Sequence, residues 1–186
     1  MEQSSLPQTE SQPNTEDFSN ISLRPFNLSD IDDFMVWATD EKVAHFCTWY
    51  PYTSKEDGLN HIKNVIIPHP WFMAICLNSR PIGGILLTTY SGNDACRGEI
   101  GYFLAYKFWG KGIGTRAVKM AAEIILRQHP EMERLEAFVD LQNVGSQKVL
   151  EKVGFERECV LRKYLIIKGK TRDMVLFSLL STYPLL

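Results

Sequence analysis

The stretch from Glu99 to Gln128 reads EIGYFLAYKFWGKGIGTRAVKMAAEIILRQ and contains an alternating segment, a glycine-rich loop and an amphipathic segment, in that order. In the last segment, apolar residues recur at spacings of three and four, which predicts a helix with one buried face. That face consists of Ala117, Met120, Ala121, Ile124 and Ile125. A strand that enters a helix through glycines predicts an anion site at the helix N-terminus.

The loop has the chemistry that such a site requires. The first amides of a helix lack partners within the helix and the peptide dipoles leave partial positive charge there, so a phosphate near 113–115 would meet both. Glycines at positions 110, 112 and 114 let the backbone approach a ligand and adopt positive φ. Four cations flank the loop, and no acid intervenes before Glu123: Lys107, Lys111, Arg116 and Lys119.

Two common phosphate motifs do not fit this loop. The Walker pattern needs four residues between its first glycine and a Gly-Lys-Ser/Thr, and no such spacing occurs here. The dinucleotide fingerprint needs a third glycine at position 115, which is Thr115. A nicotinamide-dependent oxidoreductase is therefore disfavoured.

The segment resembles motif A of the GCN5-related N-acetyltransferases (GNAT), written Arg/Gln-X-X-Gly-X-Gly/Ala, in which loop amides hold the pyrophosphate of acetyl-coenzyme A (acetyl-CoA). Trp109 stands where that pattern has Arg or Gln. This version is similar to the Tyr-Trp-Gly-Lys-Gly loop of the branch that resembles the ribosomal-protein N-terminal-alanine acetyltransferases.

A second block supports the same resemblance. The strand-like segment 135–140 is followed by Asn143-Val144-Gly145-Ser146 and by the run from Val149 to Phe155, VLEKVGF, which resemble the Asn-X-X-Ser helix of the family and its closing Leu-Glu-Lys-X-Gly-Phe. Asn143 is suited to cap this helix, and Gly154 to end it in the left-handed conformation. The resemblance covers roughly residues 22 to 181.

The resemblance implies a GNAT fold, a mixed, mostly antiparallel sheet of about seven strands with helices on both faces. Its fourth and fifth strands splay apart, and the pantetheine arm of acetyl-CoA lies in the gap. The implied cofactor-binding residues are Tyr102, Phe103, Leu104, Trp109, Gly110, Lys111, Gly112, Ile113, Gly114, Thr115, Asn143 and Ser146. The first three would act through backbone N–H groups. Trp109 would either cover the cofactor or pack the loop against the sheet, and the size of its ring favours packing.

Acyl transfer to an amine needs a base and relief of the departing thiolate. Glu99 is the candidate base because it opens the strand that leads to the loop, although a solvated edge glutamate is the alternative reading. Glu136 and Asp140 are the reserve bases. Many family members carry at position 150 a tyrosine that protonates the thiolate, and Leu150 stands there in this chain. The resemblance therefore points to Ser146 as the catalytic hydrogen-bond donor or acid toward the cofactor sulfur, with a plain cap or solvent contact of this serine as the alternative.

Composition bounds the remaining possibilities. The 186 residues are 45% hydrophobic and 23% charged, which fits one domain over 21–186. Residues 1–20 contain no Lys or Arg and are expected to be a disordered tail, and their acids disfavour signal or transit peptides. No apolar run is long enough to cross a bilayer, so we expect a cytoplasmic protein with nuclear access as a further option. The net charge of −2 gives no reason to expect nucleic acid, and the cysteines and histidines show no metal-ligand spacing.

The apolar patterns predict strands over 21–25, 71–77, 82–90, 99–104, 135–140, 155–167 and 172–180. They predict helices over 29–37, with a capping box that begins at Ser29, over 54–66, over the amphipathic segment described above and over 144–153. This order indicates a mixed α+β sheet. The aromatic loop 46–52 fits either a binding loop or a satellite core, and Tyr164, Arg172 and Asp173 either face the acceptor or pair across strands.

These observations predict an acetyl-CoA-dependent N-acetyltransferase in which a primary amine attacks the thioester directly in a ternary complex. The acceptor stays open between a protein N-terminus, a lysine, a polyamine and another small amine, and the protein is expected to be a monomer or a homodimer without a metal. The alternative is a CoA-binding sensor or interaction module that has lost turnover.

Overall fold

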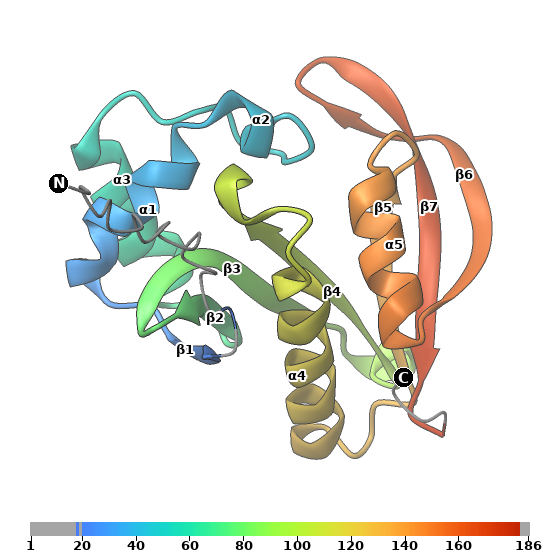
Figure 1. Ribbon diagram of the computed structural model, residues 1–186. Helices are drawn as coiled ribbons and strands as arrows, with labels where there is room; N and C mark the ends of the chain where they lie inside the picture. Colours follow the sequence, from blue (N-terminus) through green and yellow to red (C-terminus); the bar gives the residue numbers. More distant parts are fainter. Residues whose placement is uncertain (1–17, 19, 183–186) are drawn as a thin grey trace, which may run out of the picture.

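The computed structural model describes Phe18 and residues 20–182. The tail expected over 1–20 lies outside the described residues except at Phe18 and Asn20. The described chain forms one seven-stranded sheet with strand order β1-β2-β3-β4-β5-β7-β6, and the mixed, mostly antiparallel sheet expected from the sequence is confirmed (Figure 1).

The strands agree with the predicted segments to within two residues at every boundary. They are β1 (Ile21–Pro25), β2 (Phe72–Leu77), β3 (Arg80–Thr89), β4 (Arg97–Leu104), β5 (Arg134–Asp140), β6 (Glu156–Ile167) and β7 (Lys170–Leu180). The helices are α1 (Ile31–Ala38), α2 (Glu41–Ala44), α3 (Lys55–His61), α4 (Ile113–Gln128) and α5 (Val144–Val153). A π-helical turn over Ile62–Ile66 continues α3, and short 3-10 turns cover Leu28–Asp30, Gly92–Asp94 and Tyr106–Phe108.

Strands β4 and β5 form the single parallel pair in the described sheet, and they pair over only part of their length. The register runs from Arg97 opposite Arg134 to Glu99 opposite Glu136. β4 continues to Leu104 and β5 to Asp140 beyond the last paired residues. The outer edges of the two strands remain paired with β3 and β7, respectively, so the sheet opens between β4 and β5. The expected splay of the fourth and fifth strands is confirmed.

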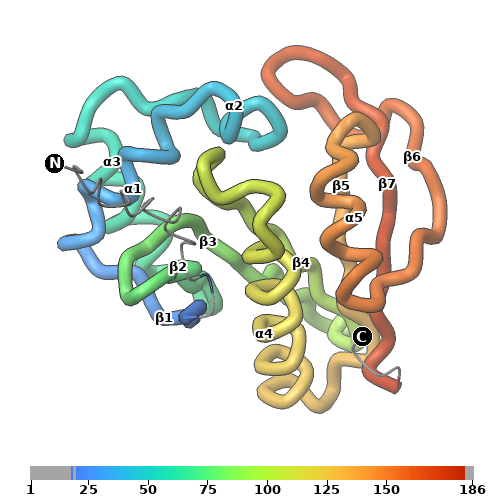
Figure 2. The backbone as a smooth tube through the Cα atoms, in the orientation of Figure 1, coloured from blue at the N-terminus to red at the C-terminus, as the bar shows by residue number. Residues whose placement is uncertain are grey.

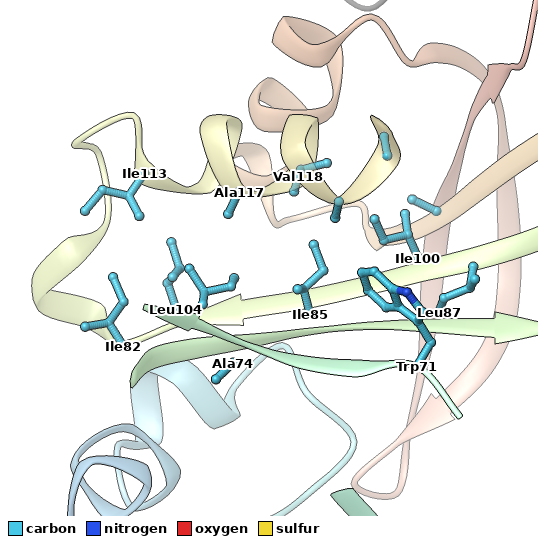
Figure 3. Packing of buried hydrophobic residues seen from close by; sticks show 14 of the residues in the cluster. Trp71, Ala74, Ile82, Ile85, Leu87, Ile100, Leu104, Ile113, Ala117 and Val118 are labelled. Carbon is cyan, nitrogen blue, oxygen red and sulfur yellow. The ribbon is translucent and has the colours of Figure 1, made fainter. Parts of the chain in front are cut away.

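The helices cover both faces of the sheet. Figure 3 shows Ile113, Ala117 and Val118 of α4 above Ile100 and Leu104, with further helices on the opposite side of the strands. The predicted apolar stripe of α4 faces the core, and Ala117, Ala121 and Ile125 are fully buried. Val118 and Ala122 are fully buried as well, so the covered face is wider than the predicted one. The helix packs against α5 as well as against the sheet, which explains the extra width.

The predicted cap of the first helical segment was wrong. Asn27, rather than Ser29, is the cap: its Oδ1 accepts from the Ser29 amide at 3.0 Å, and Asp30 Oδ2 accepts from the Asn27 amide at 2.8 Å. Asp30 is buried because Arg24 of β1 also donates to both of its carboxylate oxygens at 2.8 Å. The ion pair with Arg24 of β1 therefore holds Asp30 in the position where its carboxylate completes the capping box with Asn27.

No helix in the described part of the chain has both the length and the apolar character needed to cross a membrane.

Candidate functional site

The glycine loop enters α4 in the conformation expected of an anion site. Gly112 is the N-cap of α4 with a φ of +76°, and Gly110 has a φ of +72°. Among the residues that the structure describes, no heavy atom lies within 4 Å of a Cβ built on Gly110 or Gly112. The Arg116 amide is bonded back to the Gly112 carbonyl at 3.2 Å, which leaves the amides of 113–115 at the helix entrance. The loop therefore has the conformation that the sequence predicted for an anion site, and the binding of a phosphate there stays a prediction.

Trp109 fastens the loop to the end of β4. Its indole Nε1 donates to the Leu104 carbonyl at 2.8 Å, and its ring packs edge-on against Tyr106. These contacts are those of a ring that packs the loop, which is the role the sequence suggested. At the other side of the loop, Lys111 Nζ lies 4.7 Å from the centre of the Phe18 ring, and Arg116 Nη1 donates to the Phe18 carbonyl at 3.0 Å.

The second half of β4 borders the gap between the strands. Gly83, Gly84 and Ile85 of β3 pair with Leu104, Phe103 and Tyr102, respectively, along one edge of β4. Alternate backbone groups on the other edge point toward β5, and the β4–β5 pairing of the described sheet has ended before this segment. The Ala105 amide donates to the Ile82 carbonyl of β3 at 2.8 Å, so by alternation the backbone groups of Phe103 also face β3. Of the three residues that the sequence assigned to the cofactor, Tyr102 and Leu104 have backbone groups on the side of the gap.

Ser146 and Asn143 stand at the N-terminus of α5, where the gap meets this helix. Asn143 is the cap, since its Oδ1 accepts from the Ser146 amide at 3.1 Å, as predicted. The Tyr102 hydroxyl reaches α5 from β4 and lies 2.7 Å from Ser146 Oγ and 3.1 Å from the Ser146 carbonyl. The side chain of Tyr102 thus joins the two elements, a contact that the sequence did not predict.

Leu150, which stands where many family members have a tyrosine, is fully buried in the core cluster. The helix ends as predicted, because Gly154 adopts a φ of +108° and the amides of Gly154 and Phe155 are bonded to the Leu150 carbonyl.

Glu99 lies on the opposite face of β4 from Tyr102, because successive strand residues alternate. It is half-buried, and its Oε2 accepts a hydrogen bond from the Tyr90 hydroxyl at 3.1 Å. Burial raises the pKa of the Glu99 carboxyl above its ordinary value, and the charge of Glu136 adds to this, against the opposing effects of Tyr90 and Arg97. A carboxylate in this state is suited to accept a proton.

Glu136 is held in an ion-pair network. Arg97 Nη1 donates to its Oε2 at 3.1 Å, and Arg134 Nε donates to its Oε1 at 2.6 Å. Arg134 also forms a bidentate pair with Glu158 at 2.6 and 2.8 Å. This network stabilises the paired end of β4 and β5, and a carboxylate with two arginine donors is less suited to act as a base than Glu99 is.

The remaining polar candidates have partners within the sheet. Asp140 Oδ1 accepts from the Gln142 amide at 2.8 Å, and Arg172 Nη1 lies 3.4 Å from Asp140 Oδ2. Tyr164 stacks on Phe138 with 5.2 Å between ring centres, and Asp173 Oδ1 accepts from the Lys163 amide at 2.7 Å. Arg172, Asp173 and Tyr164 therefore pair across strands, while Tyr164 remains 49% exposed.

Aromatic side chains line the same side of β4 as Glu99. Phe103 contacts Trp49 at a centroid distance of 4.9 Å and Trp37 at 4.7 Å. Trp49 therefore belongs to a satellite core, as does Tyr52, which packs on Phe34. Tyr50 instead is 68% exposed. A binding role for the loop 46–52 stays a prediction.

Two features near this site have no clear signal in the sequence. Tyr90 follows β3 and becomes a partner of Glu99 only through the β3–β4 hairpin. Gly84 lies beneath the Phe103 ring, and a Cβ there would come within 2.6 Å of Phe103 Cζ. Two adjacent glycines in an apolar strand pattern indicate close approach, but they do not say to which residue.

Among the described residues, no group of three His, Cys, Asp or Glu side chains is arranged to hold a metal ion.

Comparison with known proteins agrees with this geometry. Residues 20–156 match the model of the acetyltransferase (GNAT) domain. The chain belongs to the GNAT family. It is accordingly an acyltransferase, and its strand order with the splayed β4–β5 pair is the framework of a GNAT domain.

Three similar proteins illustrate the range of this GNAT member's relatives. The uncharacterized N-acetyltransferase p20 of Bacillus licheniformis is 28% identical over 166 residues, which cover 87% of this chain and 93% of that protein. The [ribosomal protein uS5]-alanine N-acetyltransferase of Escherichia coli is 36% identical over 81 residues, less than half of either chain (43% and 41%). The structure of Mycobacterium smegmatis RimJ in complex with CoA-disulfide superposes with a TM-score of 0.68 at 25% identity and covers 86% of this chain and 81% of that one.

Proposed function

We propose that the protein transfers the acetyl group of acetyl-CoA to a primary amine, which attacks the thioester directly in a ternary complex. One observation carries this proposal: the gap between β4 and β5 ends beside the glycine loop, so a single ligand can reach both. The loop amides at Gly112–Thr115 would hold the pyrophosphate, and the free edge of β4 would bind the pantetheine amides. The open space beside Gly110 and Gly112 fits this assignment.

The two faces of β4 separate the two substrates in this proposal. Tyr102 shares its face of β4 with Ile100 and Leu104, which lie under α4 (Figure 3), and its hydroxyl contacts Ser146 of α5. The CoA thioester would enter on this face. Glu99 lies on the other face, where the amine would approach, and accepts a proton from that amine directly or through water. The RimJ structure with CoA-disulfide supports CoA as the ligand of the gap.

For the acceptor we propose the α-amine of a protein chain. The similarity to the uS5-alanine acetyltransferase supports this choice. A physical argument supports it as well, because an α-amine has a pKa of about 8 and a lysine amine one of about 10.4, so that the α-amine is neutral a few hundred-fold more often at neutral pH. A base of modest strength such as Glu99 therefore suffices for an α-amine.

The experiment has two parts. CoA binding is measured by calorimetry, and thiol release from acetyl-CoA is measured over a panel of peptides with free N-termini, N-terminally blocked peptides with lysine, and polyamines. We expect binding, and release that depends on a free peptide N-terminus. Binding without release for any amine supports the alternative of a CoA-binding module, while absence of binding contradicts the whole proposal.

The loop assignment has its own test in Gly112→Val. A branched side chain at this position meets a φ of +76° and fills the space that the phosphate needs, so the affinity for CoA should fall at least a hundredfold. Gly92→Val is the matched control, because Gly92 also has positive φ (+63°) and open surroundings but lies between β3 and β4. Equal losses in both variants would show that strain alone, rather than a phosphate site, explains the effect.

A further inference from the structure

Tyr102 makes a contact that the role of β4 as a backbone platform does not explain. Its hydroxyl lies 2.7 Å from Ser146 Oγ and 3.1 Å from the Ser146 carbonyl, so the phenol is held at the first turn of α5. A carbonyl only accepts, and therefore the phenol can donate to it while the serine hydroxyl donates in turn to the phenol oxygen. Two hydroxyl groups thus meet where β4, α5 and the gap come together.

The position of this pair is fixed from both sides. Ser146 is held by the Asn143 cap, and Tyr102 by the pairing of β4 with Ile85 of β3. Ile100 and Leu104, which share a face with Tyr102, are buried under α4. The phenol oxygen is thereby held in place, and its one O–H can donate to a ligand in the gap by turning away from the Ser146 carbonyl, while the Ser146 hydroxyl continues to donate to the phenol oxygen.

The Tyr102 hydroxyl also keeps its proton. Burial raises the pKa of Tyr102 above the ordinary value of a phenol, and the hydrogen bond with Ser146 opposes this only in part. A group of this kind is a poor acid toward a thiolate, whose conjugate thiol has a pKa of about 8.5. It is instead a lasting hydrogen-bond donor to negative charge.

From this geometry we infer that the Tyr102 hydroxyl donates a hydrogen bond to the sulfur of CoA as the thioester bond breaks, and that Ser146 positions it. The inference rests on the proposed function. In the reaction the C–N bond to the amine forms and the C–S bond breaks, with its electron pair going to the sulfur. Glu99 takes the proton that the amine loses, Tyr102 keeps its own, and the thiolate is protonated through solvent from Glu99.

The test compares Tyr102→Phe with the wild type, since phenylalanine keeps the ring and removes the hydroxyl. Loss of a preorganised donor to developing charge costs on the order of 10² to 10³ in kcat. We expect that fall in kcat, with the affinity for CoA near pH 7 changed less than threefold. Tyr106→Phe is the matched control. Tyr106 is a half-exposed residue of the Tyr106–Phe108 turn that packs on Trp109 with its ring, which phenylalanine keeps. The kcat of this variant should equal that of the wild type.

A second measurement does not depend on turnover. The ionisation of the CoA thiol in the complex is followed by the ultraviolet absorbance of the thiolate as the pH is raised. A donor to the thiolate stabilises the charged form, so the pKa of the bound thiol should be about one higher in Tyr102→Phe than in the wild type. Ser146→Ala should show a smaller change in the same direction, and Ser146→Thr, which keeps a hydroxyl, should restore the wild-type value.

The outcomes separate this inference from the proposed function. If the wild type binds CoA and turns over, but Tyr102→Phe retains its kcat and the pKa of the bound thiol is unchanged, the role of Tyr102 is wrong. If the wild type binds no CoA, the proposed function is wrong, and the inference about Tyr102 is wrong with it. A thermal midpoint of Tyr102→Phe within a few degrees of the wild type shows that the variant is folded.

Discussion

At the scale of single residues, Glu99 and Tyr102 show how one strand serves two different chemistries. They lie three positions apart, which places them on opposite faces of β4 and about 10 Å apart along it. Burial acts on both, raising the pKa of the Glu99 carboxyl and of the Tyr102 phenol. The consequence differs, because a carboxylate that is easier to protonate is a better base, while a phenol that is harder to ionise is a more durable donor.

Glu99→Gln tests the base. The carboxylate must be ionised to accept a proton, so kcat/KM of the wild type should fall as the pH drops through the raised pKa of Glu99, which lies above 4.5. The amide of the variant does not titrate, and we therefore expect a loss of about a hundredfold at neutral pH together with loss of this limb of the profile. Glu123→Gln, at an exposed site on α4, serves as the control and should keep the wild-type profile.

The stability of the same variant distinguishes catalysis from structure. A carboxyl whose folded pKa is raised favours folding at low pH, and this contribution is lost as the pH rises through the folded value. Removing the charge should therefore cost no stability at neutral pH, as measured by urea unfolding. A large loss of stability at pH 7 would instead assign Glu99 a structural role through Tyr90.

The residues that the sequence predicted correctly are those whose role is local. Asn143 caps the helix that begins next to it, and Gly112 and Gly154 adopt positive φ at helix ends, because backbone geometry within a few residues decides these conformations. Tyr90 and the side chain of Tyr102 were not predicted. Their partners, Glu99 and Ser146, are set by strand register and helix packing, for which a single chain gives no direct signal.

At the scale of elements, the paired end of β4 and β5 holds the two strands together, while their other ends diverge to form the gap. Both strands must part after Glu99 and Glu136, so the three registered pairs before that point carry the connection between the two halves of the sheet. Arg134 reinforces it by donating to Glu136 of its own strand and to Glu158 of β6. The sequence predicted both strands, but it did not predict this network, because its members come from strands that only the folded sheet brings together.

Arg134→Met should therefore destabilise the fold. It keeps the aliphatic stem and leaves the buried Glu136 with Arg97 alone, at an expected cost of about 2 kcal/mol in the free energy of unfolding at pH 7. Arg157→Met, at an exposed position of β6, is the control and should cost less than about 0.5 kcal/mol. Urea unfolding measures both.

The difference in free energy of unfolding between the wild type and Arg134→Met should depend on pH in one direction. Hydrogen bonds from Arg134 and Ser178 lower the pKa of Glu158 from 4.5 to about 2. A lowered carboxyl pKa gives stability that is present above the unfolded value and is lost as the pH falls through the folded one. The gap between wild type and Arg134→Met should narrow as the pH is lowered from about 4.5 toward about 2. A gap that stays constant over this range would exclude Glu158 from the effect.

At the scale of the whole molecule, the two halves that the gap separates meet again at its far end. Figure 2 shows the tip of the β6–β7 hairpin beside the segment of α2, although the two are distant in sequence. Lys168 at this tip has a φ of +50°, and its Nζ donates to the Ala44 carbonyl at 2.6 Å. The same ammonium lies 5.3 Å from the centre of the Tyr50 ring. This contact joins the hairpin to the α2 segment and its aromatic loop, on the side of the sheet where we propose that the acceptor binds.

Lys168→Met removes that contact while keeping the length of the side chain. A hydrogen bond from a charged donor contributes about 1.5 to 3 kcal/mol, so local opening of the segment from Glu41 to Tyr52 should become at least tenfold more frequent. Hydrogen exchange measures this opening in the protein without substrates, and the amides of α4 should keep their protection.

Kinetics with substrates gives a second measurement. The KM for the acceptor should rise severalfold while the affinity for CoA is unchanged, because the proposed CoA site at the loop and the free edge of β4 does not involve this contact. Lys170→Met, an exposed site on the same hairpin, should leave both quantities unchanged. Faster exchange in α4 as well would mean that the contact stabilises the whole fold rather than closing one side of the site.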